Sequence, residues 1–237
     1  MKVFVIIPAA GLGTRMTSPA KNKKPAASKQ FAELAGTPIL IHTIKKFAGS
    51  SEITEIYVAL RMNEMDSFRA RMGTEGLKKT IHLVEGGEHR QQSVAKALAA
   101  ISAAADDIVL VHDAVRPFVT GEMIREVVEA AKKYGAAIAG FPATDTIKEV
   151  KRIADGAVIT ATIPRERVVM AQTPQGFRYD WLKKAFDEAT ADGFMGTDEA
   201  SLVERSGQEV VVVMGSARNI KITTPGDMEL AEFYLGK

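Results

Sequence analysis

Apolar runs alternate with amphipathic stretches along most of the chain. Runs rich in Val and Ile predict strands at residues 3–7, 53–60, 81–85, 108–112, 136–141 and 210–214, and helical patterns lie between them. This alternation is typical of crossover units, in which parallel strands are buried beneath helices on both faces. The pattern therefore predicts an α/β protein with a Rossmann-like, mostly parallel sheet and helices on both of its faces.

Several expected helices carry recognisable end signals. Thr37-Pro38 and Thr224-Pro225 each place a capping hydroxyl before a proline, which suits the start of a helix. Thr120 marks the start of another helix, which is expected to close at Gly135. These signals predict helices that begin near residues 38, 121 and 225.

One segment, residues 145–168, breaks the alternation. Residues 146–151 and 158–163 read as short strands around a turn at Asp155-Gly156, and this pattern predicts a β-hairpin. A two-stranded arm is unstable unless it packs against something. The pattern alone favours packing on the edge of its own sheet over an arm that reaches a second subunit.

Composition narrows the class of protein. The chain has 237 residues, of which 46% are hydrophobic, so a single domain over 1–237 is expected. Its net charge of +2 gives no strong field toward nucleic acid or an anionic membrane. Cysteine is absent, which excludes disulfides and thiolate nucleophiles. The apolar start is too short for a signal peptide, and no segment approaches the length of a membrane span. A soluble, cytoplasmic protein is therefore expected.

A glycine-rich loop follows the first strand and is the first candidate binding site. It reads Pro8-Ala-Ala-Gly11-Leu-Gly13-Thr-Arg15-Met16. Small residues let backbone N–H groups approach phosphates, and Arg15 adds a positive charge. Met16 stands where a dinucleotide fingerprint has its third glycine, and no Gly-Lys-Ser/Thr follows as in a P-loop. The loop predicts a triphosphate pocket of another kind, although such a loop by itself is equally often a tight connection.

Further polar clusters stand where strands end or helices begin. Gly86-Gly87 opens a helix whose first turn could read the edge of a base. Asp113 follows a buried strand, where open α/β sheets bind ligands, and its carboxylate suits Mg²⁺. For Thr197-Asp-Glu199 an ordinary helix cap is favoured. The pattern around Lys221, alone in an apolar-flanked strand, favours a lysine at a strand edge whose apolar stem packs while its charged end reaches water.

Eight motifs in one order give the chain a resemblance to a known family. They are Ala9-Ala-Gly-Leu-Gly-Thr-Arg-Met16, Ser28-Lys-Gln-Phe31, Gly86-Gly-Glu-His-Arg90 with Ser93, Val111-His-Asp-Ala-Val-Arg-Pro117, Asp145-Thr146, Thr173-Pro-Gln175, Thr197-Asp-Glu-Ala-Ser201 and Asn219-Ile-Lys221. In these motifs the chain resembles the 2-C-methyl-D-erythritol 4-phosphate cytidylyltransferases. The resemblance implies transfer of CMP from CTP to methylerythritol phosphate in the non-mevalonate isoprenoid route.

The resemblance also implies roles for individual residues. Arg15, Lys29 and Lys221 would be the catalytic clamp on the phosphates; Ala9, Ala10, Gly11, Gly13, Gly87, Glu88 and Ser93 would bind CTP; Asp113, Arg116, Thr146 and Arg165 would bind the acceptor. Mg²⁺ would be held mainly by the triphosphate, with Asp113 as its candidate protein ligand. Lys24 in the Lys-rich loop 17–29 is the rival of Lys29 for the clamp position. The four histidines are interpreted as structural.

In the family the hairpin, residues 143–167 here, is an arm swapped across a homodimer. The resemblance therefore implies that Thr146 and Arg165 serve the neighbouring subunit, which reverses the preference drawn from the pattern alone. Two alternatives stay open. One is a cytidylyltransferase of the same fold that uses ribitol 5-phosphate. The other is a non-catalytic nucleotide-binding regulatory module, which would be expected to lack a residue of the charged clamp.

Overall fold

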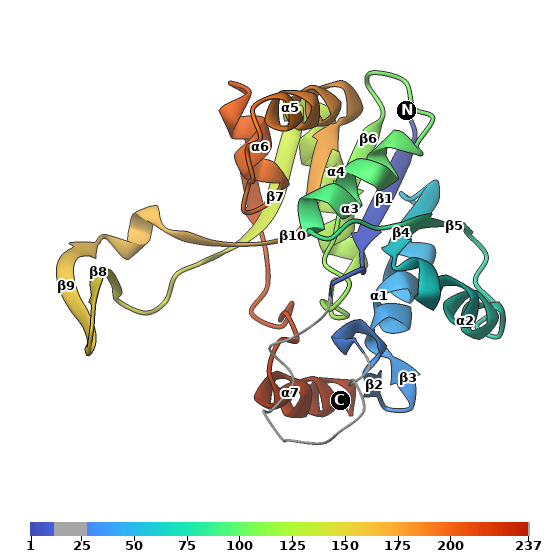
Figure 1. Ribbon diagram of the computed structural model, residues 1–237, viewed down its shortest axis with the longest axis horizontal. Coiled ribbons are helices and arrows are strands. Elements are labelled where there is room, and N and C mark those ends of the chain that lie inside the picture. Colours follow the sequence, from blue (N-terminus) through green and yellow to red (C-terminus); the bar gives the residue numbers. More distant parts are fainter. Residues whose placement is uncertain (12–27, 237) are drawn as a thin grey trace.

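The structure is a computed structural model, and it describes residues 1–11 and 28–236. Within them the largest sheet has seven strands in the order β11-β7-β10-β6-β1-β4-β5 (Figure 1). Its strands are β1 (Val3–Pro8), β4 (Glu55–Leu60), β5 (Thr80–Glu85), β6 (Ile108–Val111), β7 (Ala136–Pro142), β10 (Val169–Arg178) and β11 (Val211–Met214). All neighbouring pairs are parallel except those of β10, which runs antiparallel to β6 and β7. The predicted mostly parallel α/β sheet is confirmed.

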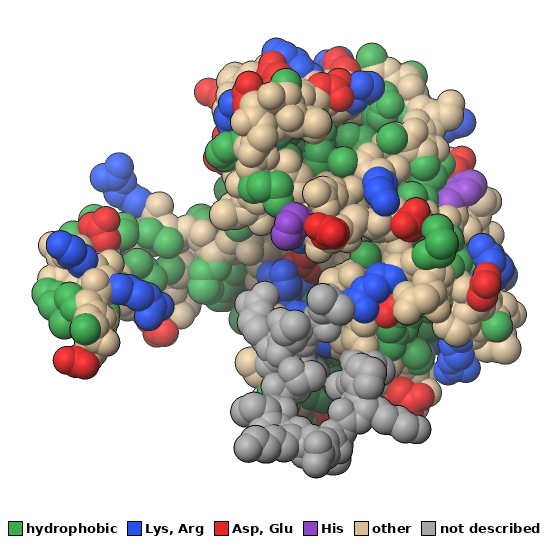
Figure 2. Space-filling model, in the orientation of Figure 1, with side chains coloured by type: hydrophobic (Ala, Val, Ile, Leu, Met, Phe, Trp, Pro, Cys, Tyr) green, Lys and Arg blue, Asp and Glu red, His purple; other side chains and the backbone are tan. Residues whose placement is uncertain are grey.

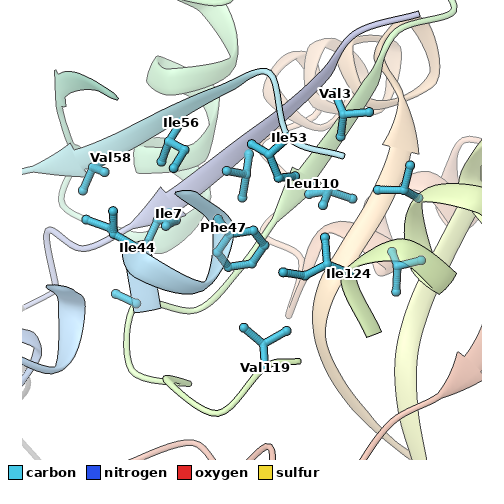
Figure 3. Packing of buried hydrophobic residues seen from close by; sticks show 14 of the residues in the cluster. Val3, Ile7, Ile44, Phe47, Ile53, Ile56, Val58, Leu110, Val119 and Ile124 are labelled. Carbon is cyan, nitrogen blue, oxygen red and sulfur yellow. The ribbon is translucent and has the colours of Figure 1, made fainter. Parts of the chain in front are cut away.

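Strand β1 lies in the interior of the sheet, between β6 and β4. Val5 and Ile7 point into one hydrophobic cluster, and Phe4 and Ile6 point into the other. Figure 3 shows the first cluster, in which Ile7 lies near Phe47. Because the strand is buried on both faces, its sequence is continuously apolar rather than alternating.

Helices cover both faces of the sheet (Figure 1). On one face α1 (Ile39–Ala48), α2 (Met62–Gly73) and α4 (Gly121–Tyr134) contribute to the first cluster. On the other face α3 (Arg90–Ala99), α5 (Tyr179–Ala191) and α6 (Glu199–Arg205) contribute to the second. The last helix, α7 (Pro225–Leu235), packs in a smaller cluster with the short strand β2 (Glu33–Leu34), which pairs with β3 (Thr37–Pro38).

The predicted helix ends are confirmed. The hydroxyl of Thr120 accepts a hydrogen bond from the backbone N–H of Met123, and Thr224 caps α7 in the same way. Gly135 closes α4 with φ of +90°, a backbone conformation that favours glycine. Helix α1 begins directly after Thr37-Pro38 as predicted, but its N-cap is Pro38 and no side chain caps it, so the expected Thr37 cap is wrong.

The sequence pattern missed strand β10 and placed a strand where there is none. Strand β10 contains Pro174 and four polar residues, and its register shifts between Ala171 and Gln175, so it lacks the expected apolar run. Its buried polar groups are instead hydrogen bonded, and Gln172 bonds the backbone of Ser216. The assignment of Lys221 to a strand is wrong, because residues 215–224 lie outside regular structure.

The hairpin consists of β8 (Ile147–Ile153) and β9 (Gly156–Ile163), which pair with each other and not with the main sheet. It projects from the body of the molecule, and β9 is exposed along its whole length (Figures 1 and 2). The expectation that the hairpin packs on its own sheet edge is wrong, since the edge strands of that sheet are β5 and β11. The division into one domain over 1–237 with an arm at 143–167 stays a prediction.

No helix in the described part of the chain is both long enough and apolar enough to cross a membrane.

Candidate active site

A cleft of about 230 Å³ opens where β1 and β6 end. Five segments far apart in the sequence line it: the end of β1 with the residues after it, the short helix η2 (Lys29–Phe31), the start of α3, the residues after β6, and Lys221 in the segment before α7. Of the predicted site residues, those that line the cleft are Ala9, Ala10, Gly11, Lys29, Gly87, Glu88, Ser93, Asp113 and Lys221. Gly13, Arg15 and the rival lysine Lys24 lie outside the described residues.

The loop before α3 packs closely against the end of β1. A Cβ added to Gly86 would lie 2.4 Å from the Cβ of Ala10, so this approach requires glycine. The hydroxyl of Ser93 accepts a hydrogen bond from the backbone N–H of Gly87 at 3.0 Å and donates to the carbonyl of His89 at 3.1 Å. Ser93 therefore fixes the shape of the loop from inside, and Gly87 and Glu88 of this loop line the cleft.

Lys29 is set at the cleft by its neighbour Gln30. The Gln30 side chain is buried, and its amide donates a hydrogen bond to the carbonyl of Ala9. This bond ties η2 to the end of β1, so Lys29 and the glycine-loop residue Gly11 line the same cleft.

Asp113 is the centre of a buried charge cluster. Its Oδ2 lies 2.9 Å from the Lys221 ammonium and 3.2 Å from Arg116 Nε, and its Oδ1 lies 3.3 Å from Arg90 Nε. Burial by itself would raise the pKa of Asp113, but the charges of Arg90, Lys221 and Arg116 outweigh it and hold that pKa well below its usual range. Asp113 is therefore a permanent anion that orients three cations.

Arg90 also pairs with a second carboxylate. Its Nη1 lies 2.7 Å from Oε1 of Glu199, the first residue of α6. Burial lowers the pKa of Arg90, but the charges of Glu199 and Asp113 raise it by more. The guanidinium therefore stays charged. Burial raises the pKa of Glu199, and the charge of Arg90 offsets part of that rise.

A buried polar network supports the segment that carries Lys221. Arg116 Nη1 donates to the carbonyl of Asn219 at 2.7 Å, and the Asn219 amide donates to the carbonyl of Thr173 at 2.9 Å. The Thr173 hydroxyl in turn accepts from the backbone N–H of Asp113 at 3.1 Å. These bonds join Thr173 of β10 to the segment after β6 and to the segment that carries Lys221. Lys221 is therefore held in place without belonging to a strand.

A second cavity of about 290 Å³ adjoins the first. Arg90, Asp113 and Lys221 line both, so the charge cluster forms the boundary between them. The second cavity is otherwise lined by Arg116, Ala171, Gln172, Thr173, Gln175, Thr197 and Asp198. Two cavities that share one set of cations can hold two anionic molecules next to each other.

Asp198 confirms the interpretation of Thr197-Asp-Glu199 as a helix start. Its carboxylate accepts a hydrogen bond from the backbone N–H of Ser201, and the Ser201 hydroxyl accepts one from the backbone N–H of Asp198, which completes a capping box. Asp198 also accepts a hydrogen bond from Gln175 at 2.8 Å. The cap therefore serves the fold and lines the second cavity as well.

Thr146 and Arg165 do not line either cavity in the described chain. Both are exposed, and Arg165 donates to the carbonyl of Thr144 at the base of the arm. Arg116 lines the second cavity only. The sequence analysis assigned no role to Arg90, Gln175 or Glu199. All three stand within the quoted motifs, and this position was the one sequence signal that could have pointed to them.

The fit of the site to Mg²⁺ depends on its carboxylates. No group of three or more His, Cys, Asp or Glu that could hold a metal ion occurs in residues 1–11 and 28–236. Asp113 is contacted by cations on both oxygens. Both oxygens of Asp113 are thus already paired with side-chain cations, which does not suit a direct ligand of Mg²⁺, and an ion held mainly by the triphosphate stays a prediction.

Three of the four histidines lie outside the cavities, whereas the exposed His89, the N-cap residue of α3, lines the cleft, so a structural role for all four stays a prediction. His112 is fully buried, its Nε2 is 3.0 Å from the carbonyl of Arg116, and its ring packs against Phe47. Burial lowers the pKa of His112 to about 4, so the ring is neutral near pH 7. His42 bonds the carbonyl of Leu34, and His82 pairs with Glu55.

The chain is similar to known proteins over its whole length. Residues 3–237 match the family model described as 2-C-methyl-D-erythritol 4-phosphate cytidylyltransferase. The protein of that name from Acidobacterium capsulatum is 57% identical over 235 residues, which cover 99% of this chain and 98% of the relative. The one from Solibacter usitatus is 50% identical, with 99% and 96% covered.

Solved structures agree with these relatives. The 2-C-methyl-D-erythritol 4-phosphate cytidylyltransferase from Thermus thermophilus has a TM-score of 0.77 and 34% identity, with all of both chains covered. The one from Francisella tularensis has a TM-score of 0.80 and 34% identity, with 98% of this chain and 99% of that chain covered.

Proposed function

Because this chain belongs to the family of 2-C-methyl-D-erythritol 4-phosphate cytidylyltransferases, we propose that it transfers CMP from CTP to 2-C-methyl-D-erythritol 4-phosphate in non-mevalonate isoprenoid biosynthesis. The observation that carries the proposal is the pair of adjoining cavities with Arg90, Asp113 and Lys221 between them. CTP takes the cleft beside the glycine loop, and the acceptor phosphate takes the second cavity.

The reaction needs charge stabilisation rather than a general base. A phosphomonoester has its second pKa near ~6, so the acceptor phosphate is already a dianion at neutral pH. One of its oxygens forms a bond to the α-phosphorus of CTP, and the bond from that phosphorus to pyrophosphate breaks, giving CDP-methylerythritol. Lys29 and Lys221 stabilise the charge that develops on the α-phosphoryl oxygens. Arg15 has the same proposed role.

The remaining cleft residues position the nucleotide. The residues Ala9, Ala10 and Gly11 at the cleft bind the phosphates, and the loop at Gly87 and Glu88, fixed by Ser93, binds the cytosine side. Gly13 has the same proposed role as Gly11. Mg²⁺, bound mainly by the triphosphate, would neutralise part of its charge. Asp113 keeps Lys221 and Arg116 oriented toward the place where the two anions meet.

Two copies of the chain form the working unit in this proposal. The arm leaves large apolar side chains exposed, namely Val150, Ile153, Val158 and Ile159. Val212 and Met214 on the edge strand β11 are also exposed. Such surfaces are suited to burial against a second copy. The arm of one subunit then brings Thr146 and Arg165 to the acceptor phosphate of its partner. We place the protein in the cytoplasm, which suits a chain without cysteine.

Pyrophosphate release from CTP and Mg²⁺ tests the function. Methylerythritol phosphate and ribitol 5-phosphate are supplied in parallel reactions. Release with methylerythritol phosphate alone supports the proposal. Release with ribitol 5-phosphate alone keeps the site and the mechanism but overturns the acceptor. No release with either acceptor, in a preparation that binds CTP, supports a regulatory nucleotide-binding module instead.

A further inference from the structure

Glu199 is a buried carboxylate with one partner. Its side chain is 1% exposed, and Oε1 accepts a charged hydrogen bond from Arg90 Nη1 at 2.7 Å. Its second oxygen, Oε2, is buried and has no hydrogen-bond partner within the described structure. Burial of a charge with an unpaired oxygen costs stability, which an amide of the same shape would avoid in part.

Helix α6 does not depend on Glu199 for its start. Asp198 and Ser201 form the capping box that satisfies the first turn. Helix capping therefore does not explain why a carboxylate stands at residue 199. Its contact with Arg90 is the remaining physical reason for the charge.

Arg90 is shared between two carboxylates. It lies 2.7 Å from Glu199 but 3.3 Å from Asp113, so Glu199 holds it more closely. Without the charge of Glu199, Arg90 is free to close on Oδ1 of Asp113, while Lys221 and Arg116 hold the other oxygen, Oδ2. Glu199 therefore limits how far Arg90 neutralises Asp113.

A neighbouring contact fixes the two helix starts relative to each other. The side chain of Gln91 donates to the carbonyl of Phe194 at 3.0 Å and accepts from the backbone N–H of Gly196 at 2.8 Å. The start of α3 is thus tied to the loop before α6, so Glu199 stands at a fixed distance from Arg90.

We propose that Glu199 is a positioning residue that holds Arg90 between itself and Asp113, and thereby sets the arrangement of the cations that line both cavities. The inference rests on the proposed function for its chemical consequence. With Glu199 neutral, Arg90 and Lys221 no longer meet the two anions in the geometry that the reaction needs.

A double-mutant cycle between Glu199 and Arg90 tests the inference. We expect E199Q to lower kcat about 10- to 100-fold, because Arg90 loses the charge that holds it while the shape of the side chain at residue 199 is kept. The double variant E199Q/R90Q should lie within about threefold of R90Q alone, because Glu199 acts through Arg90. Multiplicative losses in the double variant would overturn the inference.

Conservative variants separate charge from shape. Gln has the shape of Glu, whereas Asp keeps the charge on a shorter side chain. We expect E199D to retain more activity than E199Q; the reverse order would mean that Glu199 only fills space. E204Q makes the same chemical change at an exposed position of the same helix and should leave kcat within about twofold of wild type. If E199Q does not fold, the cycle is built from E199D and R90Q, with the same criterion.

The inference and the proposed function fail in different ways. Turnover of methylerythritol phosphate by the wild-type chain tests the function alone. If the wild-type chain is inactive with that acceptor, the cycle is measured on the Kd for CTP, because Arg90 also lines the nucleotide cleft. A loss of affinity in E199Q that disappears in the R90Q background supports the inference, and independent losses overturn it.

Discussion

At residue 113, three cationic side chains converge on one carboxylate. Each cation comes from a different part of the fold: Arg90 starts α3, Arg116 follows β6, and Lys221 lies in the segment before α7. Removal of any member leaves the others with an unbalanced buried charge, which explains why effects at this cluster should not be additive.

Lys29→Ala tests the clamp at the residue scale. We expect kcat to fall about 10²- to 10³-fold while KM for CTP rises less, because the lost charge acts mainly on the transition state. Steady-state kinetics with saturating acceptor measure both constants. Lys46→Ala removes an exposed lysine from α1 and serves as the control. A variant with unchanged kcat would transfer the clamp role to another lysine, with Lys24 as the first candidate.

His112 predicts a pH dependence of stability. Its folded pKa is about 4, whereas an unfolded histidine has a pKa near ~6.5. As the pH falls through this interval the unfolded state binds a proton that the folded state refuses, so the free energy of unfolding decreases. Between pH 7 and pH 5 the loss from this residue should be about 2 kcal/mol.

Urea unfolding of the wild type and of His112→Gln, both without Mg²⁺, measures this loss. The variant should lack the His112 contribution, so its stability should fall less over the same pH interval. His82→Gln, at a partly exposed position, is the matched control and should follow the wild type. Equal pH slopes for wild type and His112→Gln would contradict the prediction.

At the scale of elements, local signals placed most helices and strands. Thr120, Gly135 and Thr224-Pro225 carry their information in the chain itself, since caps and positive φ depend on a few adjacent residues. Strand β10 was missed because several of its buried side chains are polar. Its polar side chains form hydrogen bonds with partners distant in sequence, such as Asn219, and no local pattern shows such partners.

Gly135→Ala tests the close of α4. The residue has φ of +90°, and an added Cβ would lie 2.3 Å from the ring of Trp181. Backbone strain and overpacking together should lower the free energy of unfolding by about 3 kcal/mol or more. Gly207→Ala shares the positive φ of +85° but opens into free space, so it should cost only about 1 kcal/mol. Equal losses in urea unfolding would show that Trp181 yields to the new methyl group.

At the scale of the whole molecule, the arm is the feature that a single chain leaves unexplained. It pairs only with itself and presents apolar side chains such as Val158 and Ile159 to solvent. Neither Thr146 nor Arg165 lines a cavity of its own chain. A swapped homodimer would bury the apolar side chains of the arm and bring Thr146 and Arg165 to the site of the partner subunit.

Complementation between two inactive variants tests the swap. Lys29→Ala and Arg165→Ala are co-expressed, so that mixed dimers form. If the arm serves the partner's site, one site of each mixed dimer carries both changes and the other carries neither. Random pairing should then restore about a quarter of the wild-type activity. Activity no higher than that of the separate variants would show that each arm serves its own subunit, and sedimentation velocity verifies that dimers are present.

The sequence by itself determined the α/β class, the helix ends, the hairpin and the family, because these depend on local periodicity, on caps and turns, and on short motifs in order. Only the tertiary structure decided that the hairpin stands free of the sheet, that β10 runs antiparallel within it, and that Lys221 lies outside any strand. It also brought Arg90 and Glu199, 109 residues apart, into contact. Such pairings follow from how whole elements pack, and no short stretch of sequence contains that information.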